Sequence, residues 1–379
     1  MQALAPQQVL HLFDQHCSVN ERLSRLHERI LLQFPPIVRI ACALYDQQQD
    51  VLKTFINSTL EGQAISAYQA PLSESPTLQQ LALQGECRVI ADIQTQIKSG
   101  HTHSNWLLAQ GYRSSFTVPM YDQGNFLGFI FFDARDADFF STAVQRDLLL
   151  YCNLINMALS ADLAAVRAVI ASANMARDFV NLRDFETGAH LERMARYARL
   201  IARQVAAVYP LDDEAIEHIY LFAPLHDIGK IGIPDQILLK PGPLTAEERL
   251  VMQTHVEKGV DLIHKVIGDF DLQHLPDSKL MYQIVACHHE FMDGSGYPKG
   301  LKGDEVPIAA RIVTVADIFD ALSSHRPYKK TWSVAAALAE LEQMAAAGKL
   351  DPRCVAALAD KLEEVVWIRD NFTDPGVVL

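Results

Sequence analysis

The spacing of hydrophobic residues divides the chain into a first part with strand-like runs and a second part with helical patterns almost throughout. Five short apolar runs bounded by turn residues predict strands, at 37–45, 51–58, 87–93, 114–121 and 126–134. Helical patterns at 6–33 and 75–85 alternate with these runs. The first part is therefore expected to be an α+β domain, with an antiparallel sheet flanked by helices.

A long helical pattern without glycine or proline covers residues 141–183. Its apolar residues follow a heptad at positions 148, 152, 155, 159, 166, 169, 173 and 180. Such a stripe predicts a seam between two helices, so we expect a linker helix that joins two protomers into a homodimer. The alternative is that the stripe packs the helix on its own domains.

Strand-like runs nearly disappear after residue 184, and alanine- and leucine-rich helical patterns continue to about 367. Thr245 and Glu248 have the spacing of a capping box, and the helix that they begin is expected to carry His255. The chain is thus expected to comprise a mixed domain (1–145), a linker helix (146–183) and an all-α domain (184–379).

The formal net charge of the 379 residues is −13, which argues against a nucleic-acid polymer as partner because such a polyanion needs a basic face. Six cysteines are scattered without a CxxC pair, as expected for buried thiols in a reducing compartment. The N-terminal residues lack the basic and then apolar pattern of a signal peptide, and the apolar run 126–132 is too short for a membrane helix. We therefore expect a cytoplasmic protein without membrane association.

The second part contains an unusual set of side chains of the kinds that bind metals. Eight are candidate ligands: Glu186, His190, His226, Asp227, His255, His288, His289 and Asp317. Glu186 and His190 are four residues apart, so on a helix they share a face. Adjacent residues on a helix point about 100° apart. The His-Asp and His-His pairs therefore favour two neighbouring ions, and Asp227 can bridge them through its two oxygens.

Eight donors exceed the roughly six positions of one octahedral ion, and a catalytic ion must also keep positions open for water and substrate. The set therefore predicts two or three ions. Carboxylates without cysteine favour iron, or alternatively manganese, and do not exclude zinc or nickel. His101 and His103, in contrast, lie in a polar stretch of the first part and are expected to be solvated loop residues.

Three segments of the second part resemble, in the expected order, the signature blocks of the HD-GYP family, a branch of the HD phosphohydrolases. They are HDIGKIGIPD (226–235), HHEFMDGSGYPKGL (288–301) and ADIFDALSSHRPYKK (316–330). The resemblance covers about residues 180–370. It implies a phosphodiesterase that hydrolyses cyclic di-GMP to pGpG and GMP, with all eight donors as ligands and Glu186 on a third ion. Phe319 stands where many members have tyrosine, at a position that should not touch the metals.

The same resemblance implies roles for the residues around the metals. Asp227 and Lys230 would be catalytic, with the Lys230 ammonium fixing the scissile phosphate. The substrate-binding residues would be Lys230, Arg326, Lys329, Tyr297, Gly296 and Pro298. Signalling proteins are expected to bind through the loop that carries the Gly-Tyr-Pro triad.

The first part resembles a GAF domain, a small sensor fold. The resemblance rests on the order of its elements and on SFTVPMYDQGNFLGFIFFDA (115–134). It implies a regulatory domain with a pocket for a small ligand that the sequence does not identify. Cys42 and Cys87 are expected to be core residues rather than attachment points for a chromophore.

Two other functions remain open on the sequence. The chain could be a non-catalytic sensor of cyclic dinucleotides that signals through protein contacts, which a substituted ligand would favour. It could also hydrolyse another nucleotide, such as a mixed cyclic dinucleotide. The cations at Arg326 and Lys329 favour a dinucleotide as the substrate.

Overall fold

A computed structural model describes residues 17–180, 188–269, 278–324 and 331–373 of the chain. Within it the chain forms two compact units, Met1–Ala164 and Ala165–Leu379. The division falls within one long helix, which contributes to both units.

The first unit is built on a six-stranded sheet in the order β3-β2-β1-β6-β5-β4, with every neighbouring pair antiparallel. The strands are β1 (Ile37–Asp46), β2 (Val51–Thr59), β3 (Gln69–Pro71), β4 (Arg88–Ile90), β5 (Ser114–Asp122) and β6 (Asn125–Ala134). The central strand β1 is buried over most of its length, as its nearly continuous apolar run requires. The predicted antiparallel sheet is confirmed.

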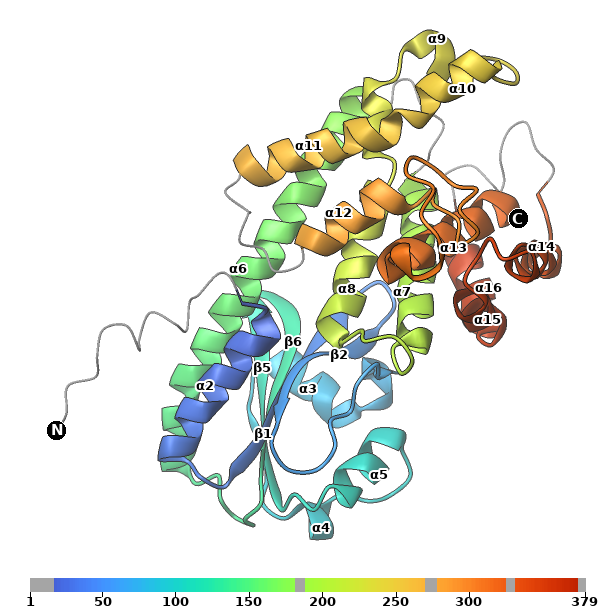
Figure 1. The fold of residues 1–379 in the computed structure, drawn as a ribbon. Helices are drawn as coiled ribbons and strands as arrows, with labels where there is room; N and C mark the ends of the chain where they lie inside the picture. The colour runs from blue at the N-terminus through green and yellow to red at the C-terminus, as the bar shows by residue number, and fades with distance from the viewer. Residues whose placement is uncertain (1–16, 181–187, 270–277, 325–330, 374–379) are drawn as a thin grey trace. The chain divides into compact units, whose positions relative to one another are not determined.

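Helices cover both faces of this sheet (Figure 1). On one face lie α2 (Val19–Gln33) and the first half of α6 (Thr142–Val180), and on the other lie α3 (Pro76–Gln84) and α5 (Thr102–Ala109). The short helix α4 (Ile93–Gln96) follows β4 because Asp92 caps it, so the strand predicted for 87–93 ends early. Helix α2 begins only after Ser18, where Ser18 and Glu21 form a capping box. The rest of the helix predicted for 6–33 lies outside the described residues.

Four of the side chains predicted to form a seam between protomers are instead buried within the first unit. Leu148, Cys152, Ile155 and Leu159 are at most 4% exposed, and the last two line a small crevice together with side chains of α2. These residues pack α6 on its own domain, so the alternative interpretation is correct for them. The seam positions 173 and 180 lie outside the described side chains.

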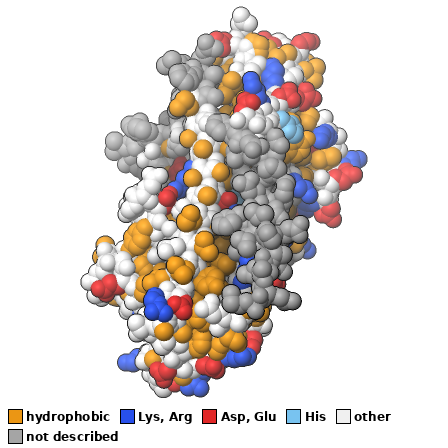
Figure 2. All heavy atoms as spheres, turned by 90° about the vertical axis from the view of Figure 1, so that its left-hand side faces the viewer, with side chains coloured by type: hydrophobic (Ala, Val, Ile, Leu, Met, Phe, Trp, Pro, Cys, Tyr) orange, Lys and Arg blue, Asp and Glu red, His pale blue; other side chains and the backbone are white. Residues whose placement is uncertain are grey.

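A second apolar stripe lies on the exposed side of the same helix. Its residues are Leu150, Leu154, Met157, Ala161, Ala164, Ala168, Ala171 and Met175, of which only Leu154 is half-buried. Figure 2 shows hydrophobic side chains along this helix. The spacing alternates between four and three residues, which is the period of a two-helix seam.

By length and composition alone, the segment Thr142–Ser172 of α6 could also cross a membrane. A helix that covers a sheet passes the same test, and Leu148 and Ile155 show that α6 covers one here. The expectation of no membrane association therefore stays a prediction.

The second unit is helical, as predicted; among its described residues, β pairing is confined to one bridge between Asp293 and Lys302. Its α-helices are α7 (Gly188–Val205), α8 (Asp213–Phe222), α9 (Asp235–Leu238), α10 (Ala246–Gln253), α11 (His255–Asp269), α12 (Ser278–Cys287), α13 (Ile308–Ser323), α14 (Val334–Ala346), α15 (Pro352–Ala359) and α16 (Leu362–Asn371). The 3₁₀ helices among the described residues of this unit are η3 (Ala223–Leu225), η4 (Ile228–Gly232) and η6 (Gly303–Glu305).

Helices α7 and α13 pack together at the centre of this unit. Tyr197 of α7 is fully buried and meets the ring of Phe319 in α13 edge-on, with 5.0 Å between ring centroids. The capping box of Thr245 and Glu248 is confirmed, but the helix that it begins, α10, ends at Gln253. His255 is instead the first residue of α11, because the chain turns at Thr254.

Candidate metal centre

Seven of the eight predicted ligands lie in described segments, and the structure gathers them into two groups of donors. The Asp227 group contains Asp227, His255, His288 and His289, and the Asp317 group contains His190, His226 and Asp317. Within each group the donor atoms lie within 4.8 Å of one another. Glu186, the eighth, lies outside the described residues.

Most of these donors lie at the ends of helices. His226 follows η3, Asp227 precedes η4, and His255 begins α11. His288 and His289 follow the last residue of α12, while His190 and Asp317 lie within α7 and α13. A 3₁₀ turn joins Asp227 to Lys230.

The His-His pair also departs from the expected geometry. On a helix His288 and His289 would point apart, toward two ions. Because α12 has already ended at Cys287, both side chains turn to the Asp227 group, with their ring centroids 4.1 Å apart. The His-Asp pair behaves as predicted, since His226 and Asp227 belong to different groups.

Glycines bring the two elements around Asp227 into contact. A Cβ atom added to Gly229 would lie 1.9 Å from the His255 carbonyl oxygen and 2.4 Å from the Gly259 backbone nitrogen. Only glycine therefore allows η4 to pack directly on α11. This close approach places Asp227 next to His255.

Asp227 lies between the two groups and turns one oxygen toward each. Its Oδ1 is 3.0 Å from His255 Nε2 and 3.6 Å from His288 Nε2. Its Oδ2 is 3.1 Å from His226 Nε2 and 2.7 Å from the Lys230 Nζ. In the second group, Asp317 Oδ1 lies 3.8 Å from His190 Nε2 and 3.9 Å from His226 Nε2. One oxygen of the Asp227 carboxylate therefore faces each donor group.

The outer nitrogens of the histidines are held by acceptors, which turns the Nε2 atoms inward. Nδ1 of His226 lies 2.9 Å from the Ala223 carbonyl oxygen, and Nδ1 of His255 lies 2.8 Å from that of Met252. Nδ1 of His288 lies 3.1 Å from the Val285 carbonyl oxygen. A neutral imidazole that donates through Nδ1 presents a lone pair at Nε2, the form that binds a metal.

These lone pairs point at one another and at a carboxylate. His255 Nε2 and His288 Nε2 are 3.4 Å apart, and both face Asp227 Oδ1. Several acceptors converge here in a buried place, which costs free energy unless a cation lies between them. The residues present therefore fit a metal ion, and the donor chemistry of imidazole and carboxylate suits a transition ion.

Burial and neighbouring charge set the protonation of the centre. Burial alone would raise the pKa of Asp227, but Lys230 and His226 outweigh it and hold that pKa well below its usual value. Burial lowers the pKa of His288 and also that of His289. The carboxylate is thus ionised and the two imidazoles neutral, as metal ligands must be.

The Gly-Tyr-Pro triad forms a tight loop against the centre. The Tyr297 ring stacks on His289, with 4.6 Å between centroids, and the Tyr297–Pro298 peptide bond is cis. A Cβ atom added to Gly296 would lie 2.4 Å from the His289 carbonyl oxygen and 2.3 Å from the Phe291 nitrogen, so only glycine fits. The carboxylate of buried Glu290 accepts the backbone N–H groups of Lys299 and Leu301 and closes the loop.

Asp320 is a further carboxylate of the centre that was not among the candidates predicted from the sequence. It is fully buried, and its Oδ2 lies 2.7 Å from Nδ1 of His190. The Arg193 guanidinium donates to both of its oxygens, at 2.7 and 2.9 Å. Asp320 therefore orients His190 from behind. The available signal in the sequence is a second acid, three residues after Asp317, in the same apolar helix.

The other residues that were predicted from the sequence lie in different parts of the molecule. Lys230 is at the centre, within reach of Asp227. Arg326 and Lys329, predicted to hold phosphates, lie outside the described residues. Of the two cysteines predicted in the core of the first unit, Cys42 is buried but Cys87 is exposed, so the prediction for Cys87 is wrong.

Comparison with known families and proteins agrees with this arrangement. Residues 175–354 match the HD domain family. The chain is 48% identical over 203 residues to a protein of Xanthomonas campestris named cyclic di-GMP phosphodiesterase response regulator RpfG, covering 52% of this chain and 50% of that one. It is 41% identical over 209 residues to a cyclic di-GMP phosphodiesterase of Thermotoga maritima, covering 54% and 52%.

A third relative is the 3′3′-cGAMP-specific phosphodiesterase 2 of Vibrio cholerae, 40% identical over 199 residues, which cover 52% of this chain and 35% of that one. The chain thus spans about half or less of the length of these relatives. Among solved structures, it is similar to the phycocyanobilin-bound GAF domain of a cyanobacterial phytochrome, with a TM-score of 0.33 and 14% identity over 42% of this chain and 96% of that one.

The two donor groups and Asp227 between them thus lie within residues 175–354, the segment that matches the HD domain family.

Proposed function

We propose that the chain is a metal-dependent phosphodiesterase that hydrolyses cyclic di-GMP to pGpG and GMP, and that its first unit regulates this activity. The observation that carries the proposal is the position of Asp227, with one carboxylate oxygen toward each donor group. The names of the Xanthomonas and Thermotoga relatives support the substrate.

The donors described above would hold two ions, iron or alternatively manganese, with Asp227 bridging them. Bound ions of this kind lower the pKa of water toward neutrality and offset the charge that develops on phosphoryl oxygens. Glu186 would hold a third ion, from its place directly before α7.

The protein's own residues would bind and orient the substrate. Lys230 is anchored by Asp227 and lies at the edge of the centre, where its ammonium can hold the scissile phosphate. Arg326 and Lys329 would hold the phosphates of the dinucleotide. Tyr297 presents an aromatic face beside His289, and together with Gly296 and Pro298 it would border a guanine base.

A second substrate has a specific observation in its favour. A relative at 40% identity is named a 3′3′-cGAMP-specific phosphodiesterase, so a mixed cyclic dinucleotide is the main competitor. A purely sensing role is disfavoured by the seven donors that the structure brings together. We expect cyclic di-GMP to be preferred and the enzyme to act in the cytoplasm.

The test of the function pairs a metal analysis with a product assay. Freshly purified protein, loaded with iron or manganese, is given cyclic di-GMP and 3′3′-cGAMP in parallel, and products are separated chromatographically. His255→Ala should lose both turnover and metal, whereas His264→Ala, an exposed histidine on the same helix, should keep both. Metal binding without turnover of either compound would favour the sensing function. Preferential turnover of 3′3′-cGAMP would make this mixed dinucleotide the proposed substrate.

We further propose that the exposed stripe of α6 joins two protomers. Its period of 3.5 residues is what a second helix of the same kind needs in order to pack against it. Met157→Glu should shift sedimentation from dimer to monomer, whereas Arg167→Glu, an exposed change off the stripe, should not. A monomeric wild-type chain at micromolar concentration would remove this part of the proposal. Signalling proteins that bind the Gly-Tyr-Pro loop would be further partners.

A further inference from the structure

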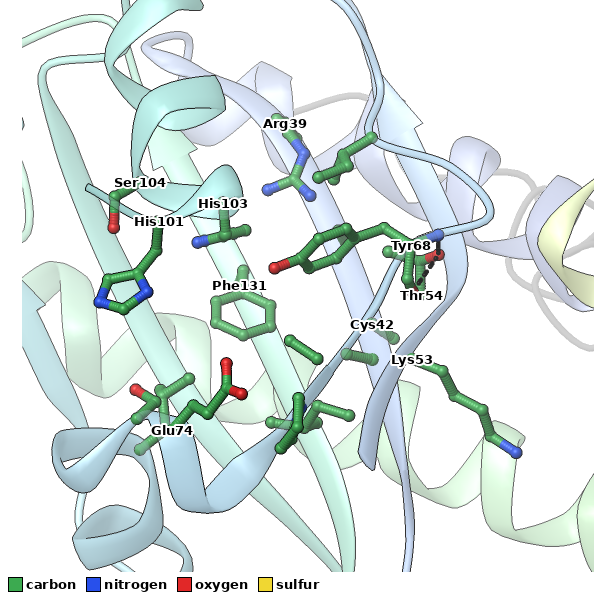
Figure 3. A pocket seen from close by; sticks show the side chains of 18 residues that line it. Arg39, Cys42, Lys53, Thr54, Tyr68, Glu74, His101, His103, Ser104 and Phe131 are labelled. Atoms are coloured by element: carbon green, nitrogen blue, oxygen red, sulfur yellow. Dashed lines mark hydrogen bonds between the residues drawn. The ribbon is translucent and has the colours of Figure 1, made fainter. Parts of the chain in front are cut away.

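The first unit contains a cavity of about 170 Å³ between its sheet and the helices on one face (Figure 3). It is separate from the metal centre and lies wholly within the first unit. A cavity of about 150 Å³ is large enough to hold benzene. This one therefore has room for a single aromatic ring with a short chain, and not for a large chromophore.

Small residues of the central strand make the space. Ala41 and Ala43 line the cavity on β1, and on the neighbouring strand β6 they pair with Phe131 and Phe129. Because the two alanine side chains end at Cβ, they leave free space above the strand at these positions. Larger side chains there would fill it.

Aromatic rings form the walls. Tyr68 stacks on His103, with ring centroids 6.2 Å apart and an angle of 29°, and His103 also contacts Phe131 at 6.4 Å. The expectation that His103 is a solvated loop residue is therefore wrong: it lies in α5 and lines the cavity. Aromatic faces of this kind attract organic cations as well as flat apolar groups.

The cations that line the cavity are already partnered by carboxylates. Arg39 NH1 donates to Asp133 at 2.5 Å, and the guanidinium lies over the Trp106 ring at 4.8 Å. Lys53 lies 3.9 Å from Asp46, and in Figure 3 it points away from the cavity. Neither side chain offers an uncompensated positive charge to a ligand.

The lining of the cavity also contains an acidic side chain. The exposed carboxylate of Glu74 lines the cavity, and in Figure 3 it points toward the Phe131 ring. Burial and the nearby Arg39 lower the pKa of His103 to about 4, so its imidazole is neutral at pH 7. At neutral pH the cavity thus combines aromatic faces with one carboxylate at its edge.

We propose that this cavity binds a small organic amine, with its ring or other flat apolar body over Ala41 and Ala43 and its ammonium beside Glu74. The ring would be enclosed by Tyr68 and Phe131, which bury its apolar surface. The ammonium would be attracted by the Glu74 carboxylate and by the faces of the aromatic rings that line the cavity. An anion of the same shape would meet Glu74 without a compensating cation.

A pair of probes of equal size and opposite charge tests this directly. Phenethylamine and 3-phenylpropionate have the same ring and a similar chain, ending in an ammonium and a carboxylate. Titration calorimetry on the full-length chain at pH 7 should show binding of phenethylamine and at least about tenfold weaker binding of 3-phenylpropionate, a difference of ~1.4 kcal/mol. Equal binding, a preference for the anion, or no binding of either up to millimolar concentration would each overturn the proposal.

Two variants locate the site. Glu74→Gln should weaken phenethylamine binding about three- to tenfold and narrow the gap between the two probes, whereas Glu86→Gln, an exposed carboxylate of the same unit outside the cavity, should leave both unchanged. Ala41→Leu should abolish binding of both probes by filling the floor, with the melting curve as a check on folding. A preference for the amine that survives Glu74→Gln intact would contradict the assigned role of this carboxylate.

Discussion

The candidate metal centre of the second unit and the cavity of the first unit treat buried charge in opposite ways. In the second unit, acceptors converge: Asp227, His255 and His288 crowd within 3.0–3.6 Å of one another with their lone pairs inward. In the first unit, the buried Arg39 is paired with Asp133, and the cavity beside them is walled by aromatic rings. Converging acceptors need a cation between them to be stable. Where the charges are already paired, a ligand is held mainly by the shape of the cavity and by dispersion contacts. The contrast separates a metal centre from a pocket for an organic ligand.

The largest expected effect lies at the bridge of the second unit. Asp227→Asn keeps the size of the side chain but removes the charge shared by both donor groups. Turnover of cyclic di-GMP should fall by about 10³-fold or more, and metal content should fall with it. Asp261→Asn on the exposed side of α11 is the matched control and should be silent. Wild-type metal content in Asp227→Asn would show that the carboxylate is not the bridge.

A smaller effect is expected at Asp320, which contacts the candidate metal ligand His190. Asp320→Asn weakens the hold on His190 and leaves Arg193 with a poorer partner. Metal affinity should drop by about 10–100-fold, as for other residues that orient metal ligands. Competition with a chelator measures this, and circular dichroism checks the fold. A variant that is only less stable, with unchanged metal affinity, would make Asp320 a structural residue.

The next largest effect is expected from the close packing of the Gly-Tyr-Pro loop. Gly296→Ala forces a methyl group into the backbone of Phe291 and His289, so the unit should lose about 1–3 kcal/mol of stability. Gly268→Ala has no atom within 4 Å of the added methyl and should cost little. Hydrogen exchange resolved by peptide reports the second unit separately from the first. Equal effects of the two changes would contradict the close packing at Gly296.

The smallest effect is a pH dependence in the first unit. The pKa of His103 is about 4 in the folded state, against an ordinary value of 6.5. Between these values the unfolded chain binds more protons, so stability is lost as the pH falls through this window. From pH 7 to pH 5 the loss should be about 1–2 kcal/mol. His103→Gln should remove this part of the acid sensitivity, as read by hydrogen exchange of peptides from α5. An unchanged pH profile in that variant would place the sensitivity elsewhere.

Local patterns were sufficient for most of the fold. The runs that became β1, β2, β5 and β6 carry their apolar residues and turns within a few positions, and the capping box of Thr245 and Glu248 was readable as a spacing. What failed depended on neighbours distant in sequence. The heptad of α6 was visible, but which of its two stripes meets the sheet is decided by α2, more than a hundred residues earlier.

The site shows the same limit. Seven donors could be named from residue type and motif, and the structure brings them together. That His288 and His289 share one group could not be foreseen, because it depends on α12 ending at Cys287. Asp320 was missed because a single chain does not show which of two acids in an apolar helix faces a histidine of α7. The sequence does not reveal the place of His103 in the cavity, because its aromatic neighbours Tyr68 and Phe131 come from other elements.

We propose that two ions lie on either side of Asp227. The most direct measurement is anomalous X-ray diffraction from crystals of the chain loaded with iron or manganese. We expect at least two peaks, one among His255, His288 and His289 and another among His190, His226 and Asp317, with Asp227 next to both. A single peak, or two peaks that Asp227 does not join, would contradict it.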